Sequence, residues 1–418
     1  MKYIKRGLLI LILLIVIGVI GGYVYLNQSN NYQVDGTIQL KGVSKDITVY
    51  RDDKGMPYVY ADNYLDLIKA QGFVTAQDRL FQMQLTRMFA EGRLTELAGE
   101  KTKPLDVRAR TMGYARNARK HAKLLNAETR EFLQAYADGV NAFIKRGENV
   151  PLEFKLAGIK PDLWTIESSL AIMYYMGWGS GGNLKTELIA HLLIEKFGLE
   201  KFKTLYPMNT NVDAPNRLPD SLAFGQERQD TSQTDSNKIS LLPAQHQQLM
   251  AFANDDLYRM KWGSNNWTVS GQLSASGKPV MASDPHLDSR TLPGVMHAMG
   301  MFAGDIRAVG VTVPGIPGLL IGRTKYISNG LTNGYLDVQD LYIETVDPAN
   351  AQNYLEGKKS IPFEKIVETL RIKDKASPNG FKEEKMTIRK TKRGIVISDH
   401  LPEAKSKQVM TLRWAAYE

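Results

Sequence analysis

A glycine–serine pair near the middle of the chain has the residue types of a self-processing nucleophile. Gly263 and Ser264 lie in the stretch KWGSNNWTV, after a polar region and before residues of strand-like pattern. If the bond between them is cut, Ser264 gains a free α-amine with a pKa of about 8, part of which is unprotonated at neutral pH. Base and nucleophile then belong to one residue, and no histidine partner is needed. An ordinary serine in a turn fits the same residues, and local chemistry alone favours that simpler interpretation.

Other familiar catalytic motifs are missing from the sequence. The chain has no Ser-x-x-Lys, no His-Glu-x-x-His and no cysteine, and its six histidines are dispersed. The stretch GWGSGG (177–182) lacks the spacing of a nucleophile elbow, and GQLSASGKP (271–279) fits a hairpin turn better than a phosphate loop. These absences argue against a serine β-lactamase, thiolate chemistry, disulfides and cysteine-ligated metals.

The composition is that of a globular protein with an excess of positive charge. The chain has 418 residues, 43 % of them hydrophobic and 23 % charged, and a formal net charge of +9. This length is enough for more than one packed layer of secondary structure. Residues 371–393 mix both signs of charge, which favours a solvated, lysine-rich hairpin over a nucleic-acid groove. We therefore expect no nucleic-acid partner.

The N-terminus has the pattern of a membrane anchor. Residues 1–6 are basic, and residues 7–25 are apolar and about long enough to cross the hydrocarbon core of a bilayer. The positive flank is expected to stay in the cytoplasm, which places the rest of the chain outside. No clear small-residue cleavage site follows, so a single-pass anchor in the cell membrane is favoured. A secreted or periplasmic protein, released by signal cleavage, is the alternative.

The residues after the anchor change from strand to helix patterning. Alternation of apolar and polar residues around the turn DDKG predicts two short strands forming a hairpin within residues 38–61. From Asn63 onward apolar residues recur at helical spacing, which is interrupted at Gly92 and Gly99.

Helical patterning continues to about the middle of the chain and then gives way to strands. It runs through residues 105–147 and 166–206, and a nearly uniformly polar stretch follows at 226–238. After Ser264 the pattern is one of short β-type runs separated by glycine turns. The sequence thus predicts a helix-rich first half and a strand-rich second half.

Five sequence blocks in a fixed order resemble the penicillin acylase family, which belongs to the N-terminal-nucleophile hydrolases. The resemblance covers roughly residues 36–418. Because several blocks occur in the same order at plausible spacing, the likeness is far more specific than any single motif. The blocks are residues 51–100, WGSNNWTVSG (262–271), GKPVMASDPHL (277–287), GVTVPGIPGLLIG (310–322) and LTNGYLDVQDLYIE (331–344).

This resemblance implies a fold and a processing scheme. The implied fold is α+β, a four-layer αββα sandwich with two antiparallel sheets between helical layers. Family members are made as precursors that lose a spacer, and their α and β segments stay together as a processed heterodimer. The corresponding parts of this chain are an anchor or signal segment (1–28), an α-segment (36–225), a spacer (226–263) and the start of a β-segment (264–418).

The resemblance also implies catalytic roles. Ser264 falls on the family nucleophile, freed by self-cleavage after Gly263, and His286 falls where relatives have a residue that helps to bind and orient groups near it. Asn333 falls on the segment that offers a backbone N–H to the oxyanion, a donor worth about 3 kcal/mol. The family's second oxyanion donor lies further along the β-segment than residue 418. We therefore expect an incomplete sandwich and oxyanion hole in this chain.

Carboxylates and apolar residues carry the remaining implied sites. Glu187, Asp337 and Asp340 match positions that hold a structural calcium ion in the family, and hard oxygen ligands suit Ca²⁺. Ordinary surface acids are the alternative. Met176 and Trp178 are candidates for lining the acyl pocket, although a methionine–aromatic cluster is as often plain core. No organic cofactor is implied.

The implied activity is hydrolysis of a carboxamide in a linear N-acyl substrate, the reaction type of EC 3.5.1. The Ser264 hydroxyl would attack the carbonyl carbon, and water would release the acyl-enzyme. Candidate substrates are a penicillin-type side-chain amide or an acyl-homoserine lactone, and the sequence does not choose between them. An inactive membrane-anchored binding or scaffold protein of the same fold is the alternative.

Overall fold

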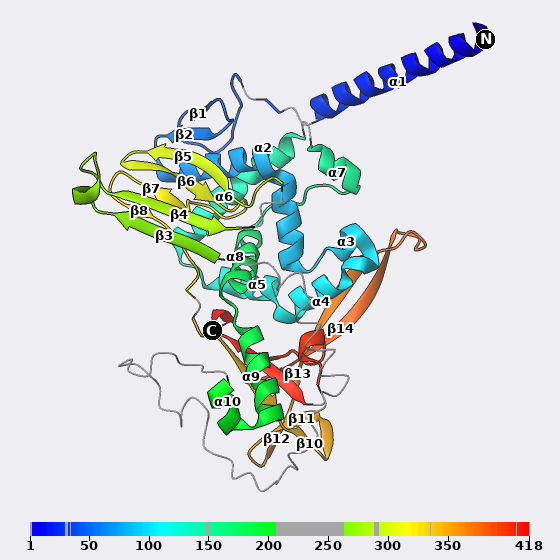
Figure 1. The fold of residues 1–418 in the computed structure, drawn as a ribbon, viewed down its shortest axis with the longest axis vertical. Coiled ribbons are helices and arrows are strands. Elements are labelled where there is room, and N and C mark those ends of the chain that lie inside the picture. Colours follow the sequence, from blue (N-terminus) through cyan, green and yellow to red (C-terminus); the bar gives the residue numbers. More distant parts are fainter. Residues whose placement is uncertain are drawn as a thin grey trace. The chain divides into compact units, whose positions relative to one another are not determined.

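The computed structural model describes residues 2–29, 32–33, 35–147, 150–205, 263–287, 292–334, 336–406 and 408–417 (Figure 1). The expected spacer lies outside the described residues, except for Gly263 at its end. Contacts group the chain into two units. The first comprises Met1–Ser180, Lys261–Gly334 and Val367–Thr387, and the second comprises Gly181–Met260, Tyr335–Ile366 and Ile388–Glu418.

The N-terminal segment forms one long helix, α1 (Lys2–Ser29). Its apolar part, Arg6–Leu26, has a mean hydropathy of 2.8, and none of it is buried against the rest of the chain. By length and composition this helix is able to cross a membrane, and a signal sequence has the same properties.

Helices fill the next part of the first unit, as their apolar spacing predicts. Asn63 caps the first of them, α2, by accepting the Asp66 N–H, and Gly92 ends it with a positive φ of 63°. Gly99 ends α3 in a similar way, with a φ of 69°. Both predicted breaks are therefore confirmed. The helices are α2 (Tyr64–Glu91), α3 (Thr95–Ala98), α4 (Lys103–Met112), α5 (Tyr114–Leu124), α6 (Ala127–Arg146), α7 (Leu152–Ala157) and α8 (Ile166–Gly181).

A six-stranded sheet in the order β1-β2-β5-β6-β7-β8 completes this unit's core. The predicted hairpin around DDKG is confirmed as β1 and β2, although residues 38–47, expected to contribute to it, form no strand. Strand β2 pairs in parallel with β5, and the other neighbours are antiparallel. The strands are β1 (Thr48–Arg51), β2 (Pro57–Ala61), β5 (His297–Ala303), β6 (Ile306–Thr312), β7 (Ile321–Arg323) and β8 (Ser328–Asn329).

Helices α2 and α6 pack against each other and against this sheet, as Figure 1 shows. Val59 and Met299 project from the sheet into the shared core and are fully buried. The helices touch backbone to backbone at Gly139, because a methyl group there would lie 1.9 Å from the Lys69 carbonyl oxygen. Glycine at this position thus permits the close packing of the helix pair.

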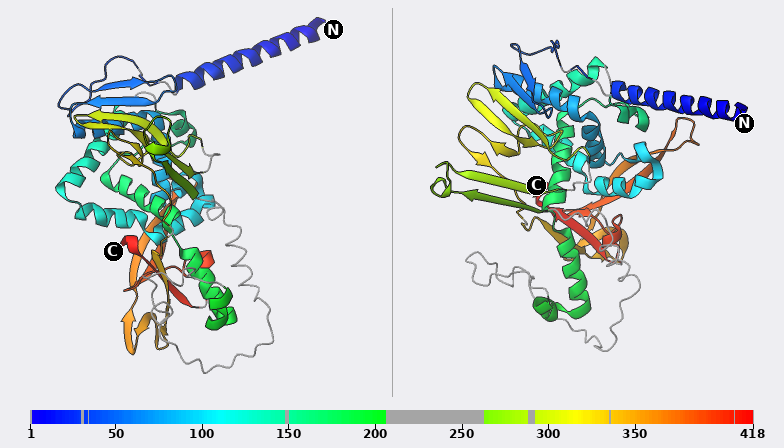
Figure 2. Two further views of the ribbon diagram at one scale, coloured as in Figure 1. Left: turned by 60° about the vertical axis from the view of Figure 1, so that its left-hand side comes forward. Right: turned by 45° about the horizontal axis from the view of Figure 1, so that its top comes forward.

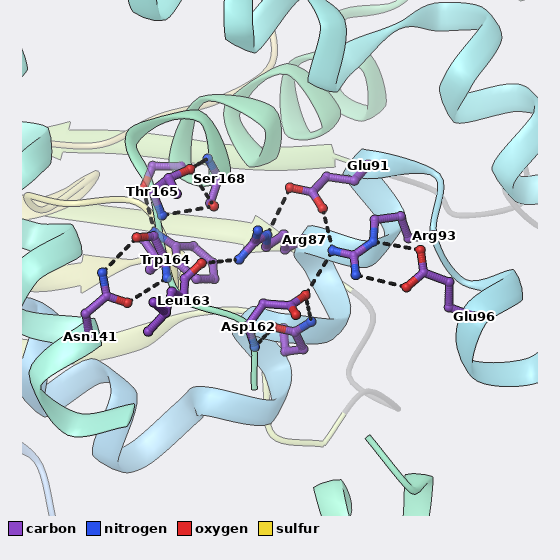
Figure 3. Close-up of polar contacts among 12 residues, drawn as sticks. Arg87, Glu91, Arg93, Glu96, Asn141, Asp162, Leu163, Trp164, Thr165 and Ser168 are labelled. Carbon is purple, nitrogen blue, oxygen red and sulfur yellow. Dashed lines mark hydrogen bonds and ion pairs between the residues drawn. The ribbon is translucent and has the colours of Figure 1, made fainter. Parts of the chain in front are cut away.

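A network of charged side chains links the end of α2 to the segment that leads into α8 (Figure 3). Arg93 forms 2.9 Å contacts with Glu91, Glu96 and Asp162. Arg87 donates to Glu91 at 2.9 Å and to the carbonyl oxygen of Leu163 at 2.8 Å. These bonds fix the start of α8, which carries two of the residues singled out in the sequence.

Strands β3 (Gly263–Val269) and β4 (Val280–His286) form a separate two-stranded sheet, the nucleophile hairpin (Figure 2). They are antiparallel, and residues 270–279 make the turn between them. This confirms the strand–turn–strand prediction and the interpretation of GQLSASGKP as a turn.

The second unit also begins with helices and continues with strands. Its five-stranded sheet has the order β13-β14-β15-β16-β9, and a three-stranded sheet has the order β10-β11-β12. The prediction of a hairpin over residues 371–393 is confirmed by β13 and β14, which the division between the units crosses. The described chain is therefore α+β, as predicted. The elements are α9 (Leu184–Phe197), α10 (Leu199–Leu205), β9 (Gln339–Glu344), β10 (Val346–Asp347), β11 (Asn350–Glu356), β12 (Lys359–Pro362), β13 (Glu364–Lys373), β14 (Phe381–Thr391), β15 (Gly394–Val396) and β16 (Val409–Trp414).

Candidate active site

Ser264 lies at the start of the nucleophile hairpin, where β3 begins. Its hydroxyl donates a 2.7 Å hydrogen bond to the carbonyl oxygen of Gly263. Because that oxygen belongs to the peptide bond expected to be cut, the hydroxyl lies beside the group it would attack. Both residues are half-buried, so the junction is open to solvent.

His286 is the direct cross-strand partner of Gly263. Its ring Nδ1 is 3.3 Å from the point where a methyl group on Gly263 would stand, so its ring lies on the face that Gly263 leaves open. Ser264 pairs with Pro285, and successive side chains in a strand point to opposite faces. The His286 ring and the Ser264 hydroxyl therefore belong to opposite faces of the hairpin.

Asp284 fixes the His286 side chain. Its Oδ2 is 3.2 Å from the Nε2 of His286, and the two residues share a face of β4 because they are two positions apart. The histidine side chain is 46 % exposed, so this contact restrains its orientation without removing it from water.

The segment that carries Asn333 lies next to Ser264. The Thr332 hydroxyl donates to the carbonyl oxygen of Ser264 at 3.4 Å. Further back, the Asn329 side chain donates to the carbonyl oxygen of Leu320 at 2.9 Å. Asn333 itself is half-buried. The structure thus places Thr332, the residue before Asn333, beside Ser264.

The three predicted calcium ligands occur together in the second unit. Burial raises the pKa of the Glu187 carboxyl, and the negative charges of Asp337 and Asp340 raise it further, to about 7. An N–H of Leu341 that bonds to this carboxyl acts in the opposite direction. Asp337 and Asp340 are exposed. Over the described ranges no three His, Cys, Asp or Glu side chains form a ready-made metal cage.

Asn183 and Gln339 tie the helix that carries Glu187 to the strand that carries the aspartates. Asn183 Nδ2 donates to Asp337 Oδ1 at 2.7 Å, and its Oδ1 accepts the Val338 N–H at 3.2 Å. The buried Gln339 side chain accepts the N–H of Leu184 at 2.7 Å. These amides hold the carboxylates near one another although like charges repel.

Met176 and Trp178 both lie on α8 and are half-buried. Met176 packs against the main core of the first unit. The Trp178 ring lies 6.2 Å from that of Tyr114, centroid to centroid. Both side chains are therefore partly packed against the rest of the first unit. Their role in lining an acyl pocket stays a prediction.

Sequence reasoning missed the polar residues that support the candidate site. Asp284, Asn183 and Gln339 each bond to a predicted site residue or to its immediate neighbourhood. Asp284 could have been predicted, because residues two apart in a strand share a face and Asp284 is two residues before His286. The other two carry no sequence signal, because only the fold brings their partners within reach.

The described chain has the α+β fold expected of the N-terminal-nucleophile hydrolases. The chain belongs to the penicillin amidase family, whose model, described as Penicillin amidase, matches residues 46–418.

Two relatives named as acylases are each 30 % identical to this chain over the stretch that matches. It is 30 % identical over 395 residues to penicillin acylase 2 proenzyme of Pseudomonas sp. (strain SE83), covering 91 % of this chain and 47 % of the relative. It is 30 % identical over 343 residues to acyl-homoserine lactone acylase QuiP of Pseudomonas syringae pv. syringae (strain B728a), a match that covers 81 % of this chain and 40 % of that relative. A solved structure, a thermostable penicillin G acylase from Alcaligenes faecalis, is 26 % identical, with a TM-score of 0.35 over 42 % of this chain and 97 % of that one. The chain spans about half the length of the curated relatives it matches.

Proposed function

We propose that the protein is an amide hydrolase that acts on N-acyl substrates through Ser264 after self-cleavage at Gly263–Ser264. Membership of a family whose relatives are named acylases supports the amide-hydrolase part of the proposal. The single observation that carries the choice of nucleophile is the 2.7 Å hydrogen bond from the Ser264 hydroxyl to the Gly263 carbonyl oxygen.

Self-cleavage would begin with attack of the Ser264 hydroxyl oxygen on the carbonyl carbon of Gly263. The C–N bond breaks, the Ser264 nitrogen takes up the proton, and an ester joins Gly263 to the serine oxygen. Water then hydrolyses this ester, which leaves a carboxylate on Gly263 and a free amine on Ser264. His286, beside Gly263 and oriented by Asp284, would help to orient the groups around the junction.

Amide hydrolysis would use the same hydroxyl with the new amine as its base. The amine accepts the hydroxyl proton while the oxygen attacks the substrate carbonyl, and it then returns the proton to the leaving amine. The backbone N–H of Asn333 would stabilise the negative oxygen of the tetrahedral intermediate. Water attacks the resulting ester and releases the acid. Met176 and Trp178 are proposed to line the acyl pocket.

The substrate is proposed from the two kinds of relative. Their names point to a penicillin-type side-chain amide or to an acyl-homoserine lactone, both of which contain a carboxamide. Neither is favoured by the described residues, because pocket shape depends on a few side chains from both segments. A panel of both substrate types, assayed with the purified full-length protein, would choose between them.

Calcium is proposed to bind Glu187, Asp337 and Asp340, linking the α-segment to the β-segment after cleavage. The donor set fits the ion, because burial and the two nearby aspartates make the Glu187 carboxyl costly to ionise and a divalent cation would offset that cost. Both aspartates are exposed, so water or backbone carbonyls would supply the remaining ligands. The ion would act in structure and not in the chemical step.

The catalytic part is proposed to lie outside the cytoplasm, attached to the cell membrane by α1 or released by signal cleavage. The apolar stretch and its basic flank support either arrangement.

Intact mass and N-terminal sequencing of the purified full-length protein test the proposal. We expect two fragments, one of which begins at Ser264. An intact chain without amide hydrolysis would instead support the alternative of an inactive binding or scaffold protein of the same fold.

A further inference from the structure

We propose that Gly330 is a positioning residue, which rests on Asn266 and Ser283 and thereby sets how closely the Asn333 N–H approaches the Ser264 hydroxyl. The inference rests on the hydrolase proposed above. It concerns residues to which the sequence analysis assigned no role.

Asn266 and Ser283 lie on the same face of the nucleophile hairpin as the Ser264 hydroxyl. They are direct cross-strand partners, and so are Ser264 and Pro285. Residues two apart in a strand share a face, so Ser264 and Asn266 project to one side, together with their partners. This face is the one from which a substrate would reach the nucleophile.

Gly330 packs directly onto this pair. A methyl group at Gly330 would stand 3.1 Å from the Cβ of Ser283 and 3.2 Å from the Cγ and Nδ2 of Asn266. Such distances are shorter than ordinary carbon contacts of about 3.5–4.0 Å. The Ser283 Cβ is fixed to its strand and cannot rotate away. A methyl group would therefore push residue 330 outward by a few tenths of an ångström.

A displacement of residue 330 would also move the Asn333 N–H, the proposed oxyanion donor, because both belong to the short segment 329–333. It is attached on one side by the Asn329 bond to Leu320 and on the other by the Thr332 bond to Ser264. Gly330 lies between these two attachments. The Asn266 Oδ1 and Ser283 Oγ are enclosed and have no hydrogen-bond partner in the part of the chain that the structure describes. At Gly330, therefore, van der Waals packing on Asn266 and Ser283, and not a hydrogen bond from these side chains, sets the distance between residues 329–333 and the hairpin.

The expected signature is a loss in kcat with little change in KM. An oxyanion donor bonds most strongly to the transition state, so moving it by a fraction of an ångström slows the chemical step more than it weakens substrate binding. We expect Gly330→Ala in the full-length protein to lower kcat at least about tenfold and to change KM by less than about twofold. The matched control is Gly294→Ala, because a methyl group at Gly294 meets nothing within 4 Å.

A second substitution that restores kcat would distinguish a positioning role of Gly330 from a general loss of folding. Removing the Ser283 Cβ makes room for the new methyl group, so the Ser283→Gly/Gly330→Ala double variant should regain most of the lost kcat. Wild-type kcat in Gly330→Ala, or a double variant as slow as the single one, would overturn the proposal. So would an equal loss in Gly294→Ala.

Hydrogen exchange tests the packing without relying on turnover. Backbone amides over residues 330–333 should exchange faster in Gly330→Ala and return toward the wild-type rate in the double variant. If the protein hydrolyses no amide but shows this pattern, the proposed function fails and the packing role stands. Identical exchange in all three proteins would show that Gly330 does not position the segment.

Discussion

The α2–α6 helix pair and the nucleophile hairpin belong to one unit and differ in how they are packed. Tyr136, Ala137 and Val140 on α6 are fully buried, and the two helices meet through glycine. Along β3, by contrast, no residue is buried, and the Trp267 side chain is 55 % exposed. Figure 2 shows the hairpin as a separate pair of strands.

This difference separates the main source of stability from the proposed place of reaction. Burial of apolar surface stabilises the helix pair and the sheet beneath it. A nucleophile must be reached by substrate and, in a precursor, by water, so the strand that carries Ser264 has to remain accessible. Substitutions in the two regions should therefore affect different measurements, stability in the first and turnover in the second.

The largest effect is expected from Ser264→Ala. Without the hydroxyl neither self-cleavage nor acyl transfer is possible, so turnover should fall by at least about 10⁴-fold, while the thermal midpoint changes little. Intact mass and an amide-hydrolysis assay on the full-length protein measure the two consequences. Residual turnover near the wild-type rate would assign the nucleophile to another residue.

Gly139→Ala should be the most damaging of these changes for stability. Its methyl group would lie 1.9 Å from the Lys69 carbonyl oxygen, a backbone atom that cannot move alone. We expect a loss of about 3 kcal/mol or more in the free energy of unfolding, measured by denaturant titration. Gly177→Ala is the matched control, because it adds a methyl group into open space on helix α8. Equal effects of the two substitutions would contradict the packing of the helix pair.

The carboxylates of the second unit should make stability depend on pH and on calcium. The folded-state pKa of Glu187, about 7, lies above its ordinary value of 4.5, so between these pH values the folded protein binds more protons than the unfolded one. Without a divalent cation, stability should therefore fall as pH rises from about 4.5 to about 7.

Calcium should flatten this dependence by stabilising the ionised carboxylates, and Glu187→Gln should remove its contribution. Thermal midpoints measured across this pH range, with calcium and with a chelator, test both statements. Midpoints that are the same with chelator and with calcium would argue against the calcium site.

Trp267→Ala should have the smallest effect on stability. Because this side chain is more than half exposed, we expect a change of about 0.5 kcal/mol or less in the free energy of unfolding. Denaturant titration beside Gly139→Ala gives the comparison directly. A loss as large as that of Gly139→Ala would mean that the hairpin contributes to the core.

Local sequence signals predicted local structure well. The start of helical spacing at Asn63, the helix breaks at Gly92 and Gly99 and the three hairpins depend on neighbours in the chain, and the structure confirms them. The prediction that residues 38–47 contribute a strand was wrong in part, because alternation of apolar residues does not specify whether a pairing partner is present.

Contacts between distant segments were beyond the reach of such signals. The approach of Gly139 to Lys69 and of Gly330 to Ser283 depends on how separate elements pack, and glycine has many other uses in a sequence. Likewise, the alternation of β3 and β4 indicated two strands, but only their register placed His286 on the face opposite the Ser264 hydroxyl.

The sequence by itself determined the order of helices and strands, the family resemblance and the chemical types at residues 264, 286 and 333, since these depend on residue identity and short-range spacing. Only the tertiary structure decided which face of the hairpin each side chain occupies, which amides hold Glu187 near two aspartates, and which glycine supports the segment before Asn333. The physical reason is that packing distances and electrostatic shifts arise between residues far apart in the chain, where spacing along the sequence carries no information.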